Sequence, residues 1–438
     1  MKFPTFKSGI HPTEFKYFTE SIAIETLPKP KEVFIPLQQH IGAPCKSLVE
    51  VGDTVKIGQV IGSTEAYVSS PVHATISGTV KDISRYLSPI GTRSQMIHII
   101  APDEEETNGV YNEVDWTNLP SDELRNRIKN AGIVGLGGAA FPTHVKLNPP
   151  ENKPIDTFIL NGCECEPFLT ADHRIMLEMP DNVLKGMAII MKVLGVKKGY
   201  IGIESNKPNA IESMKKSVSD YGFEIITVKT KYPQGAEKML IKAIKNRKVP
   251  TGGLPMDVGV VVHNVGTAVA VANAVLYEKP LTQRVVTVTG NGVKQPKNLM
   301  VTIGTRFSDV IEFCGGLADE TVQVFMGGPM MGIAQYDLSV PVIKATSGIV
   351  CTTDYKQVEP LACIGCGSCV QSCPMFLMPT RLARLSYIKH WSDADTMGIM
   401  NCIECGSCAY VCPSSIPLVQ WIRVGKQKVY EMQCDLVG

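Results

Sequence analysis

The sequence predicts a multidomain α/β protein that ends in a small cysteine-rich domain. Three observations support this prediction. The chain has 438 residues, which is enough for roughly two to four domains that each bury a core. Between residues 117 and 277, buried-strand patterns alternate with helical patterns, as in a parallel α/β sheet. Near the C-terminal end, a run of four cysteines with fixed spacing occurs twice.

Residues 1–105 are predicted to form a small all-β module. Apolar and polar residues alternate between glycine-containing turns, most clearly over 51–62 and 70–80. This pattern resembles the biotinyl/lipoyl barrel-sandwich fold, whose cofactor-carrying members present a lysine at a hairpin tip. The chain has no lysine in that setting, so we expect a structural module without a covalent cofactor. His73, near the predicted tip, is expected to be a solvent-exposed loop histidine.

Residues 117–277 are predicted to form a Rossmann-like domain with a parallel sheet. We expect buried strands at 157–160, 199–203 and 223–228, and helices at 180–194 and 208–221. The most apolar segment, 258–276, contains polar residues and a central Gly266, which favours a strand followed by a helix over a membrane span. The acidic residues 103–106 indicate a linker before this domain.

Residues 280–335 return to strand patterns. Gly290 and Gly292 flank an asparagine in a turn signal, and one short helix is expected at 307–314. This segment resembles a β-grasp module of the SLBB type.

The doubled cysteine run, within residues 355–420, is the strongest chemical signal. Each run has the spacing C-x2-C-x2-C-x3-C-P found in bacterial two-cluster ferredoxins, where the fourth cysteine of one run binds the cluster of the other. We therefore predict two [4Fe–4S] clusters. One is assigned to Cys363, Cys366, Cys369 and Cys412, and the other to Cys402, Cys405, Cys408 and Cys373. Two structural zinc sites are the alternative, although these typically use cysteine pairs separated by a long gap.

A glycine-rich segment followed by a lysine indicates a phosphate-binding loop. Residues 135–146 read GLGGAAFPTHVK, and such turns expose backbone N–H groups that can face phosphate, while Lys146 adds a positive charge. A tight structural turn is the alternative. The candidate binding residues in this loop are Gly135, Gly137, Gly138, Phe141 and Lys146.

Four motifs in order resemble the NADH-oxidising flavoprotein subunit of respiratory complex I. Residues 135–146 are similar to its GxGGAGFPxxxK loop, and 160–167, 235–237 and 263–267 to its CNADEGEP, GEE and NNVET segments. The resemblance implies FMN as a cofactor and NAD(H) as the substrate. It also implies further residues near the flavin: Asn161, Glu164, Glu166, Glu237, Asn264 and Thr267.

The resemblance implies roles for several of these residues. Glu164 and Glu166 would contact the flavin edge and the nicotinamide side, although they could instead cap a helix or pair with Lys146. Phe141 either stacks on adenine or flavin or packs internally. Hydride transfer needs no general acid from the protein, so we expect no catalytic side chain.

Four positions depart from that family's pattern. They are Cys163, Cys165, Ala236 and His263. These departures bear on the NADH contacts more than on FMN binding. We expect the two cysteines to be buried thiols in the pocket wall, because two cysteines one residue apart are poor partners for a single tetrahedral ion.

The order of the four modules resembles the RnfC subunit of the Rnf complex, an ion-translocating ferredoxin:NAD oxidoreductase. The resemblance implies a subunit that passes electrons between NAD(H), FMN and two [4Fe–4S] clusters, coupled in the complex to Na⁺ or H⁺ translocation. The implied partners are the other Rnf subunits, including the membrane subunits and the ferredoxin-like RnfB. The implied location is peripheral, on the cytoplasmic side of the cell membrane. A soluble corrin reductase of the propanediol-utilisation type and an electron relay without NADH activity are the alternatives.

Charge and composition agree with these expectations. The chain has 43 basic and 42 acidic residues, so nucleic acid is not an expected partner. The N-terminus has no apolar signal region, and we expect a soluble chain whose membrane link comes through a partner. Two basic stretches flank the clusters and are expected to be solvated, with docking to a partner or to lipid as the alternative. They comprise Arg381, Arg384 and Lys389, then Arg423, Lys426 and Lys428.

Overall fold

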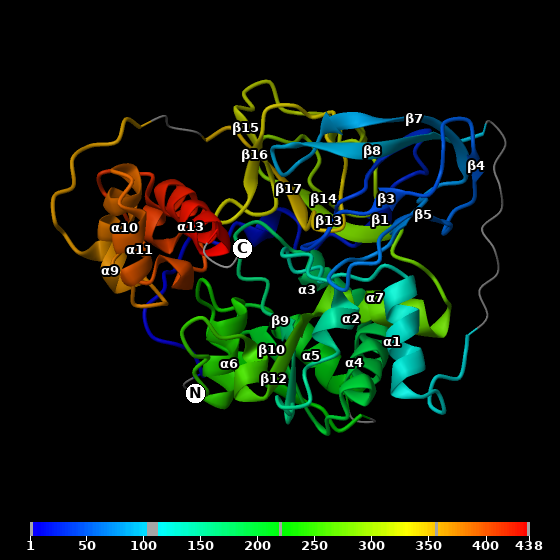
Figure 1. The fold of residues 1–438 in the computed structure, drawn as a ribbon, viewed down its shortest axis with the longest axis horizontal. Helices are drawn as coiled ribbons and strands as arrows, with labels where there is room; N and C mark the ends of the chain where they lie inside the picture. The colour runs from blue at the N-terminus through cyan, green and yellow to red at the C-terminus, as the bar shows by residue number, and fades with distance from the viewer. Residues whose placement is uncertain (1–2, 103–112, 219–220, 355–357, 436–438) are drawn as a thin grey trace.

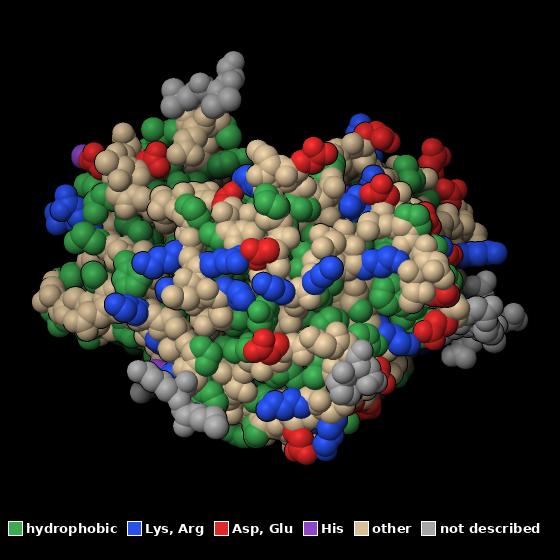
Figure 2. Space-filling view, turned by 90° about the horizontal axis from the view of Figure 1, so that it is seen from below, with side chains coloured by type: hydrophobic (Ala, Val, Ile, Leu, Met, Phe, Trp, Pro, Cys, Tyr) green, Lys and Arg blue, Asp and Glu red, His purple; other side chains and the backbone are tan. Residues whose placement is uncertain are grey.

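The computed structural model describes residues 3–102, 113–218, 221–354 and 358–435. Figure 1 shows a parallel-sheet domain, with two β-rich modules above it and a helical domain at one side. None of the helices in these ranges is long and apolar enough to cross a membrane. Seen from the side of the parallel-sheet domain, Lys and Arg side chains form a band across the middle of the face, and most Asp and Glu side chains lie toward its edges (Figure 2).

The N-terminal module consists of two small sheets around one apolar core. One sheet has the order β2-β8-β7-β4 and the other β3-β5-β6. The strands are β2 (Glu32–Pro36), β3 (Lys46–Ser47), β4 (Thr54–Val55), β5 (Val60–Ser63), β6 (Val72–His73), β7 (Gly78–Leu87) and β8 (Arg93–Ile100). Fully buried Val33, Ile61 and Ile97 lie in the core between the sheets. This arrangement agrees with the predicted barrel sandwich.

His73 is buried, and the expectation of a solvent-exposed histidine is wrong. Its side chain is 3% exposed, and its Nε2 lies 2.8 Å from the carbonyl oxygen of Asn130. The strand β6 packs against the end of the first helix of the next domain. Burial lowers the pKa of His73 to about 3, so the ring is neutral at physiological pH.

The second domain has a parallel sheet, as predicted, and its four strands lie in the order β11-β10-β9-β12. Its strands are β9 (Thr157–Gly162), β10 (Lys198–Glu204), β11 (Glu224–Val228) and β12 (Val260–Asn264). Its helices are α1 (Ser121–Asn130), α2 (Thr143–Lys146), α3 (Ala171–Glu178), α4 (Pro180–Leu194), α5 (Pro208–Ser217), α6 (Glu237–Lys245) and α7 (Val265–Leu276). The apolar segment that could have suggested a membrane span is β12 and α7, buried against α4.

Close packing fixes the position of α7, whose N-terminus reaches the site described below. A Cβ atom added at Gly186 in α4 would lie 1.9 Å from the carbonyl oxygen of Ala268 in α7. Only glycine permits the two helix backbones to approach this closely.

The third module is a six-stranded mixed sheet in the order β1-β14-β13-β17-β15-β16. Its elements are β1 (Ile24–Thr26), β13 (Gln283–Thr289), β14 (Lys297–Thr302), α8 (Phe307–Phe313), β15 (Gln323–Met326), β16 (Ile333–Gln335) and β17 (Gly348–Thr352). The strands β1 and β17 come from outside residues 280–335. The sheet therefore joins an N-terminal segment to the strand that precedes the cysteine-rich domain.

The C-terminal domain is helical and lies at the left in Figure 1. Its helices are α9 (Ser368–Ser372), α10 (Pro379–Tyr387), α11 (Trp391–Thr396), α12 (Ser407–Tyr410) and α13 (Leu418–Asp435). Buried Leu382, Ile399 and Ile422 form its core together with Cys369 and Cys408. The N-terminal segment contacts this domain, because the amide of Gly9 donates a 3.0 Å hydrogen bond to the carbonyl of Ser372.

Candidate functional site: a cofactor cavity beside two cysteine sets

A cavity of about 570 Å³ lies where the parallel-sheet domain, the mixed sheet and the helical domain meet. The carboxyl ends of β9 and β12 open into it, as is usual for ligand sites of parallel α/β sheets. Every predicted cofactor residue except Thr267 lines this cavity: Gly135, Gly137, Gly138, Phe141, Lys146, Asn161, Glu164, Glu166, Glu237 and Asn264. The volume falls within the range of small-molecule sites.

The glycine-rich loop is a tight turn that also forms one wall of the cavity. The amide of Gly135 donates to the carbonyl of Phe141 at 2.9 Å, and the amide of Ala140 donates to the carbonyl of Gly135 at 3.1 Å. Gly138 has φ +115°, and a Cβ added there would meet no atom within 4 Å. The loop therefore leaves space beside its backbone that a bound group could fill.

Thr267 supports this loop from behind. Its hydroxyl oxygen accepts a 2.9 Å hydrogen bond from the amide of Leu136, and its side chain is completely buried. Thr267 lies in the first turn of α7. It therefore couples the N-terminus of that helix to the loop.

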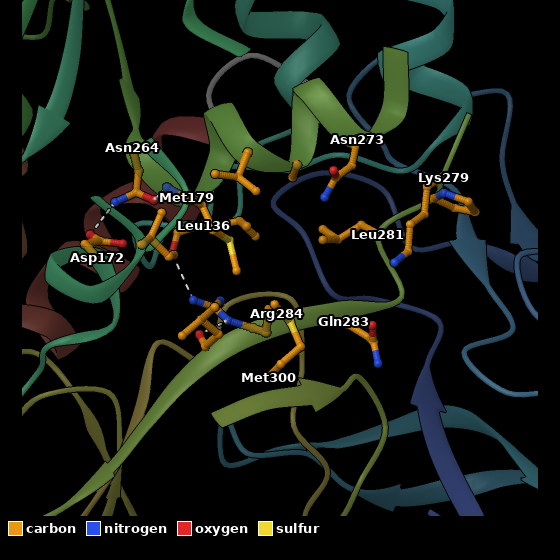
Figure 3. Close-up of a pocket in the computed structure, with 16 residues that line it drawn as sticks. Leu136, Asp172, Met179, Asn264, Asn273, Lys279, Leu281, Gln283, Arg284 and Met300 are labelled. Carbon is orange, nitrogen blue, oxygen red and sulfur yellow. Dashed lines mark hydrogen bonds between the residues drawn. The ribbon is translucent and has the colours of Figure 1, made fainter. Parts of the chain in front are cut away.

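Asn264 joins α7 to α3, as Figure 3 shows. Its side-chain oxygen accepts from the amide of Gly266 at 2.8 Å, which caps α7, and its side-chain nitrogen donates to the carboxylate of Asp172 at 2.6 Å. Burial and the neighbouring charge of Glu164 raise the pKa of Asp172. Behind the loop, the buried guanidinium of Arg284 donates to the carbonyls of Leu136, at 3.3 Å, and Lys344.

The two predicted glutamates bind backbone amides. The carboxylate of Glu164 accepts from the amides of Asp172 and His173, at 2.7 and 3.1 Å, and so caps α3. The carboxylate of Glu166 accepts from the amides of Met330 and Met331, at 3.1 and 3.0 Å. Burial raises the pKa of Glu166 to about 7.

Lys146 pairs with Glu237 at the mouth of the cavity, and not with Glu164 or Glu166. Both partners are partly exposed. Asn161 donates from its side-chain nitrogen to the carbonyl of Gly235 at 2.8 Å. These contacts bring three of the four sequence motifs together around one space.

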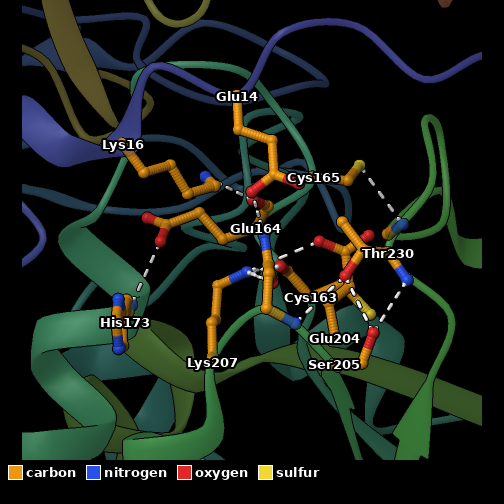
Figure 4. Close-up of polar contacts among 12 residues, drawn as sticks. Glu14, Lys16, Cys163, Glu164, Cys165, His173, Glu204, Ser205, Lys207 and Thr230 are labelled. Carbon is orange, nitrogen blue, oxygen red and sulfur yellow. Dashed lines mark hydrogen bonds and ion pairs between the residues drawn. The ribbon is translucent and has the colours of Figure 1, made fainter.

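Two buried lysines hold the 163–169 segment, and neither has a local signal in the sequence. The ammonium of Lys16 donates to the carbonyls of Glu164, Glu166 and Leu169, at 2.9, 3.0 and 2.6 Å. The ammonium of Lys207 donates to the carbonyl of Cys163 at 2.7 Å and pairs with buried Glu204 (Figure 4). Lys16, which comes from the N-terminal segment, therefore holds the backbone of residues 164–169 beside the cavity.

The prediction of buried thiols in the pocket wall holds only in part, because Cys163 is buried but does not line the cavity, whereas Cys165 lines it but is only half-buried. Both are free, and burial raises the pKa of each thiol, which keeps it neutral. Cys165 lines the cavity, and its sulfur accepts a 3.2 Å hydrogen bond from the amide of Gly235.

An unpaired polar atom in the cavity wall fits a bound cofactor. His263 is 4% exposed and lines the cavity, and its Nε2 has no hydrogen-bond partner among the described residues. Burial lowers the pKa of His263 well below 6.5, so the ring is neutral. Buried polar groups normally have partners, so a ligand atom is the expected one here. The glycine wall, the capped helix N-termini and this histidine together suit a flavin nucleotide.

The eight cysteines of the two runs surround two separate cavities in the crossed arrangement that the spacing predicts. Cys363, Cys366, Cys369 and Cys412 line one cavity, and Cys373, Cys402, Cys405 and Cys408 line the other. Within the described ranges, no three His, Cys, Asp or Glu side chains converge as they would around a single metal ion.

The surroundings of these thiols suit iron–sulfur clusters. The amide of Leu377 donates to the sulfur of Cys373, and the amide of Glu404 donates to that of Cys402, each at 3.4 Å. Such N–H···S bonds, together with an apolar shell, tune cluster potentials. The donor sets therefore fit two clusters.

The second cysteine set adjoins the cofactor cavity. Cys405 and Ile403 line that cavity as well as their own. A Cβ added at Gly406 would lie 2.6 Å from the carbonyl oxygen of Met330, in the mixed-sheet module. The first set lies outward, because Cys363 and Cys366 are exposed.

The two basic stretches differ in structure. Arg423 and Lys426 pair with Glu404, and the ammonium of Lys426 also donates to the carbonyl of Cys402 at 2.8 Å. These two cations thus hold the loop of the second cysteine set. The expectation of a solvated face is wrong for Lys426, whose side chain is 21% exposed, whereas the Arg423 side chain remains 41% exposed. Arg381 and Arg384 are exposed, as expected.

Comparison with known proteins matches four domain families in order along the chain. They are an RnfC barrel sandwich hybrid domain at residues 4–105, a Nuo51 FMN-binding domain at 128–273, an SLBB domain at 285–334 and a 4Fe-4S dicluster domain at 355–413. These matches confirm the predicted fold class and the predicted FMN and iron–sulfur cofactors. They favour clusters over the two structural zinc sites.

Three relatives are similar to the chain over nearly its whole length. The C subunit of a proton-translocating ferredoxin:NAD(+) oxidoreductase complex from Clostridium ljungdahlii is 48% identical over 97% of this chain and 94% of its own length. The Na(+)-translocating counterpart from Acetobacterium woodii is 45% identical over 98% of each chain. The C subunit of an ion-translocating oxidoreductase complex from Rhodobacter capsulatus is 42% identical over 98% of this chain and 84% of its own. Among solved structures, a chain of an NAD+-reducing [NiFe]-hydrogenase aligns with a TM-score of 0.48 at 20% identity, over 61% of this chain and 53% of its own.

Proposed function

Because the chain belongs to the RnfC family of ion-translocating ferredoxin:NAD(+) oxidoreductase complexes, we propose that it exchanges electrons between NAD(H) and other subunits through FMN and two [4Fe–4S] clusters. One observation carries this proposal. Cys405 lines both the cofactor cavity and the cavity of the second cysteine set. A cluster held there would border the flavin site directly.

FMN, when bound, accepts two electrons with a hydride and releases them one at a time, as iron–sulfur clusters require. The chain supplies binding and orientation for this chemistry. The amides of the 135–141 loop and the N-terminus of α7 favour the phosphate end, and Lys146 adds a positive charge at the cavity mouth. The carboxylates of Glu164 and Glu166 accept hydrogen bonds from backbone amides of the cavity wall. We propose that the same two residues also contact the flavin and the nicotinamide.

The positions of the two cysteine sets support an order for electron transfer. The set of Cys373, Cys402, Cys405 and Cys408 adjoins the cofactor cavity, whereas exposed Cys363 and Cys366 belong to the outer set. We assign the outer cluster to exchange with another subunit and the inner cluster to exchange with the flavin.

The place of the chain in a complex is also proposed. The relatives are subunits of complexes that translocate protons or Na(+). We place this chain peripherally on the cytoplasmic side of the cell membrane, with membrane subunits and a ferredoxin-like subunit as partners. Ion translocation would belong to the membrane subunits.

NADH-dependent bleaching of the flavin tests the proposal. Protein reconstituted anaerobically with FMN, iron and sulfide should lose its flavin absorbance when NADH is added, and its clusters should then be reduced. Lys146→Met should slow this reaction about tenfold or more, a loss of about 1.4 kcal/mol. Lys153→Met, at a lysine that pairs with Asp257 outside the cavity, should not.

Each alternative function has a distinct result. No bleaching in material that contains both FMN and iron would favour an electron relay without NADH activity, and would contradict the proposal. NADH-driven reduction of cobalamin at the rate of flavin bleaching would favour a corrin reductase.

A further inference from the structure

We propose that the outer face of the helical domain, around Cys363 and Cys366, is the docking site for an acidic one-electron redox protein. We call this surface the outer face and define it by Ile364, Val370, Met378, Ile388, Arg381 and Arg384, which all line the cavity of the outer cysteine set. The inference rests on the proposed function, since it names the kind of partner that exchanges electrons with the outer cluster.

The outer face is apolar and open to solvent. Ile364, between two of the cysteines, is 72% exposed, and Met378 and Ile388 are 49% and 46% exposed. These side chains surround the cavity of about 540 Å³ that the four cysteines of the outer set also line, so they would ring a cluster bound there. Apolar side chains gathered around one hollow are typical of an interaction site rather than of ordinary surface.

Two cations lie on the outer face. Arg381 and Arg384 lie one helical turn apart on α10, and both are exposed. Neither side chain makes a hydrogen bond or ion pair with another described residue. By contrast, Arg423 and Lys426, beside the inner set, are both paired with Glu404.

This charge selects the partner. Unpaired cations beside an apolar hollow complement an acidic surface, and such pairs mainly raise the rate of encounter and fix the orientation of the complex. Methionine and arginine are also enriched in protein interfaces. An anionic membrane would match the same side chains, but lipid headgroups are not redox-active and could not exchange electrons with a cluster held by the outer set.

The position of the outer face leaves the NAD(H) site free. Figure 1 shows α9 and α10 at the outer edge of the helical domain, turned away from the parallel sheet. The inner set lies between this face and the cofactor cavity, through Cys405. A docked protein could therefore exchange electrons with the outer cluster while nucleotide occupies the cavity.

The test reverses the two charges in the reconstituted full chain. The probe is a small acidic two-[4Fe–4S] ferredoxin, reduced chemically, and the measurement is the second-order rate of cluster reduction in stopped flow at low ionic strength. Arg381→Glu/Arg384→Glu should lower this rate about tenfold or more and weaken its dependence on salt. The matched control Lys197→Glu/Lys198→Glu changes the same charge at two exposed lysines of the parallel-sheet domain and should stay within about twofold of the wild type.

Two further measurements check the same surface. With basic cytochrome c as the electron acceptor and NADH as the donor, the charge reversal should increase the rate rather than lower it. Ile388→Ser should weaken ferredoxin binding, measured by calorimetry, without changing the iron content. Iron and FMN contents of all variants establish that they fold and load equally.

Equal ferredoxin rates in the wild type and the charge-reversed variant would overturn the proposal. So would equal losses in the reversed variant and the lysine control. Binding to phosphatidylglycerol vesicles that the reversal abolishes, with ferredoxin rates unchanged, would assign the face to lipid and would also overturn it. The ferredoxin experiment needs no NADH. Failure of NADH-dependent bleaching would therefore contradict the proposed function, while the ferredoxin rates would still decide whether the outer face is a docking site.

Discussion

The phenol of Tyr232 donates a 2.6 Å hydrogen bond to the carbonyl oxygen of Cys405. The bond crosses from the parallel-sheet domain to the helical domain, and the side chain is 1% exposed. Burial raises the pKa of Tyr232, so the phenol remains a donor at any working pH. One hydrogen bond thus joins a residue of the cofactor-cavity wall to a loop of the inner cysteine set.

Tyr232→Phe should change the inner cluster and spare the outer one. Loss of the donor removes positive potential near the inner cluster, which should lower its midpoint potential by up to about 60 mV, or about 1.4 kcal/mol for one electron. A redox titration followed by electron paramagnetic resonance measures both clusters in one sample. Equal shifts of both potentials, or none, would contradict a local effect.

Cysteine replacement should reveal the crossed pairing of the two sets. Cys373→Ala should leave about four of the expected eight irons and the same spectrum as Cys402→Ala, although these residues belong to different runs. Cys412→Ala should match Cys363→Ala instead. If Cys373→Ala resembled Cys363→Ala, each run would hold its own cluster and the crossed assignment would be wrong.

Thr267→Val should weaken FMN binding although Thr267 does not line the cavity. Valine keeps the shape but leaves the buried amide of Leu136 without its acceptor, at a cost of about 1–3 kcal/mol. FMN affinity, measured by quenching of flavin fluorescence, should fall. Thr267→Ser retains the hydroxyl and is the control. A comparable loss in the serine variant would point to packing rather than to the hydrogen bond.

Glu166 should make stability depend on pH near neutrality. Its pKa is about 7 in the folded protein, above its ordinary value of 4.5, so the native state binds this proton more tightly than the unfolded state. Stability from this group is therefore present at low pH and is lost as pH rises through about 7. The largest difference is about 3 kcal/mol.

Glu166→Gln removes the titration. The variant should gain stability relative to the wild type between about pH 5 and about pH 8, measured as the difference in thermal midpoints. Glu65→Gln, at an exposed position of the N-terminal module, should show no such trend. Parallel curves for Glu166→Gln and the wild type would mean that the carboxyl group does not titrate in this range.

Local spacing made much of the site predictable from the sequence. The three closely spaced cysteines of each run lie within one loop and helix turn, and the 135–146 loop needs only its own backbone to form its turn. The alternation of strands and helices likewise placed β9, β10 and α4 close to their observed bounds. These features depend on residues near one another in the chain.

Contacts between distant segments were not predictable. Lys16 reaches residues about 150 positions away, and nothing near it in the sequence marks this role. His73 was expected in solvent because the packing of β6 on α1 has no local signature. Glu166 lies in a motif expected to bind the cofactor, and its carboxylate accepts from the amides of Met330 and Met331, about 165 positions away. The sequence motifs thus identified the cofactors, but they did not identify the residues that each side chain contacts.

The ammonium of Lys16 has a practical consequence for dissecting the protein. A fragment restricted to residues 117–277 would include the carbonyls of Glu164, Glu166 and Leu169 but would lack the cation that holds them. It would also lack Met330 and Met331, the amides that Glu166 binds. Domain boundaries drawn along the chain thus do not mark an autonomous flavoprotein. A truncated version would have a pocket whose floor differs from that of the intact polypeptide.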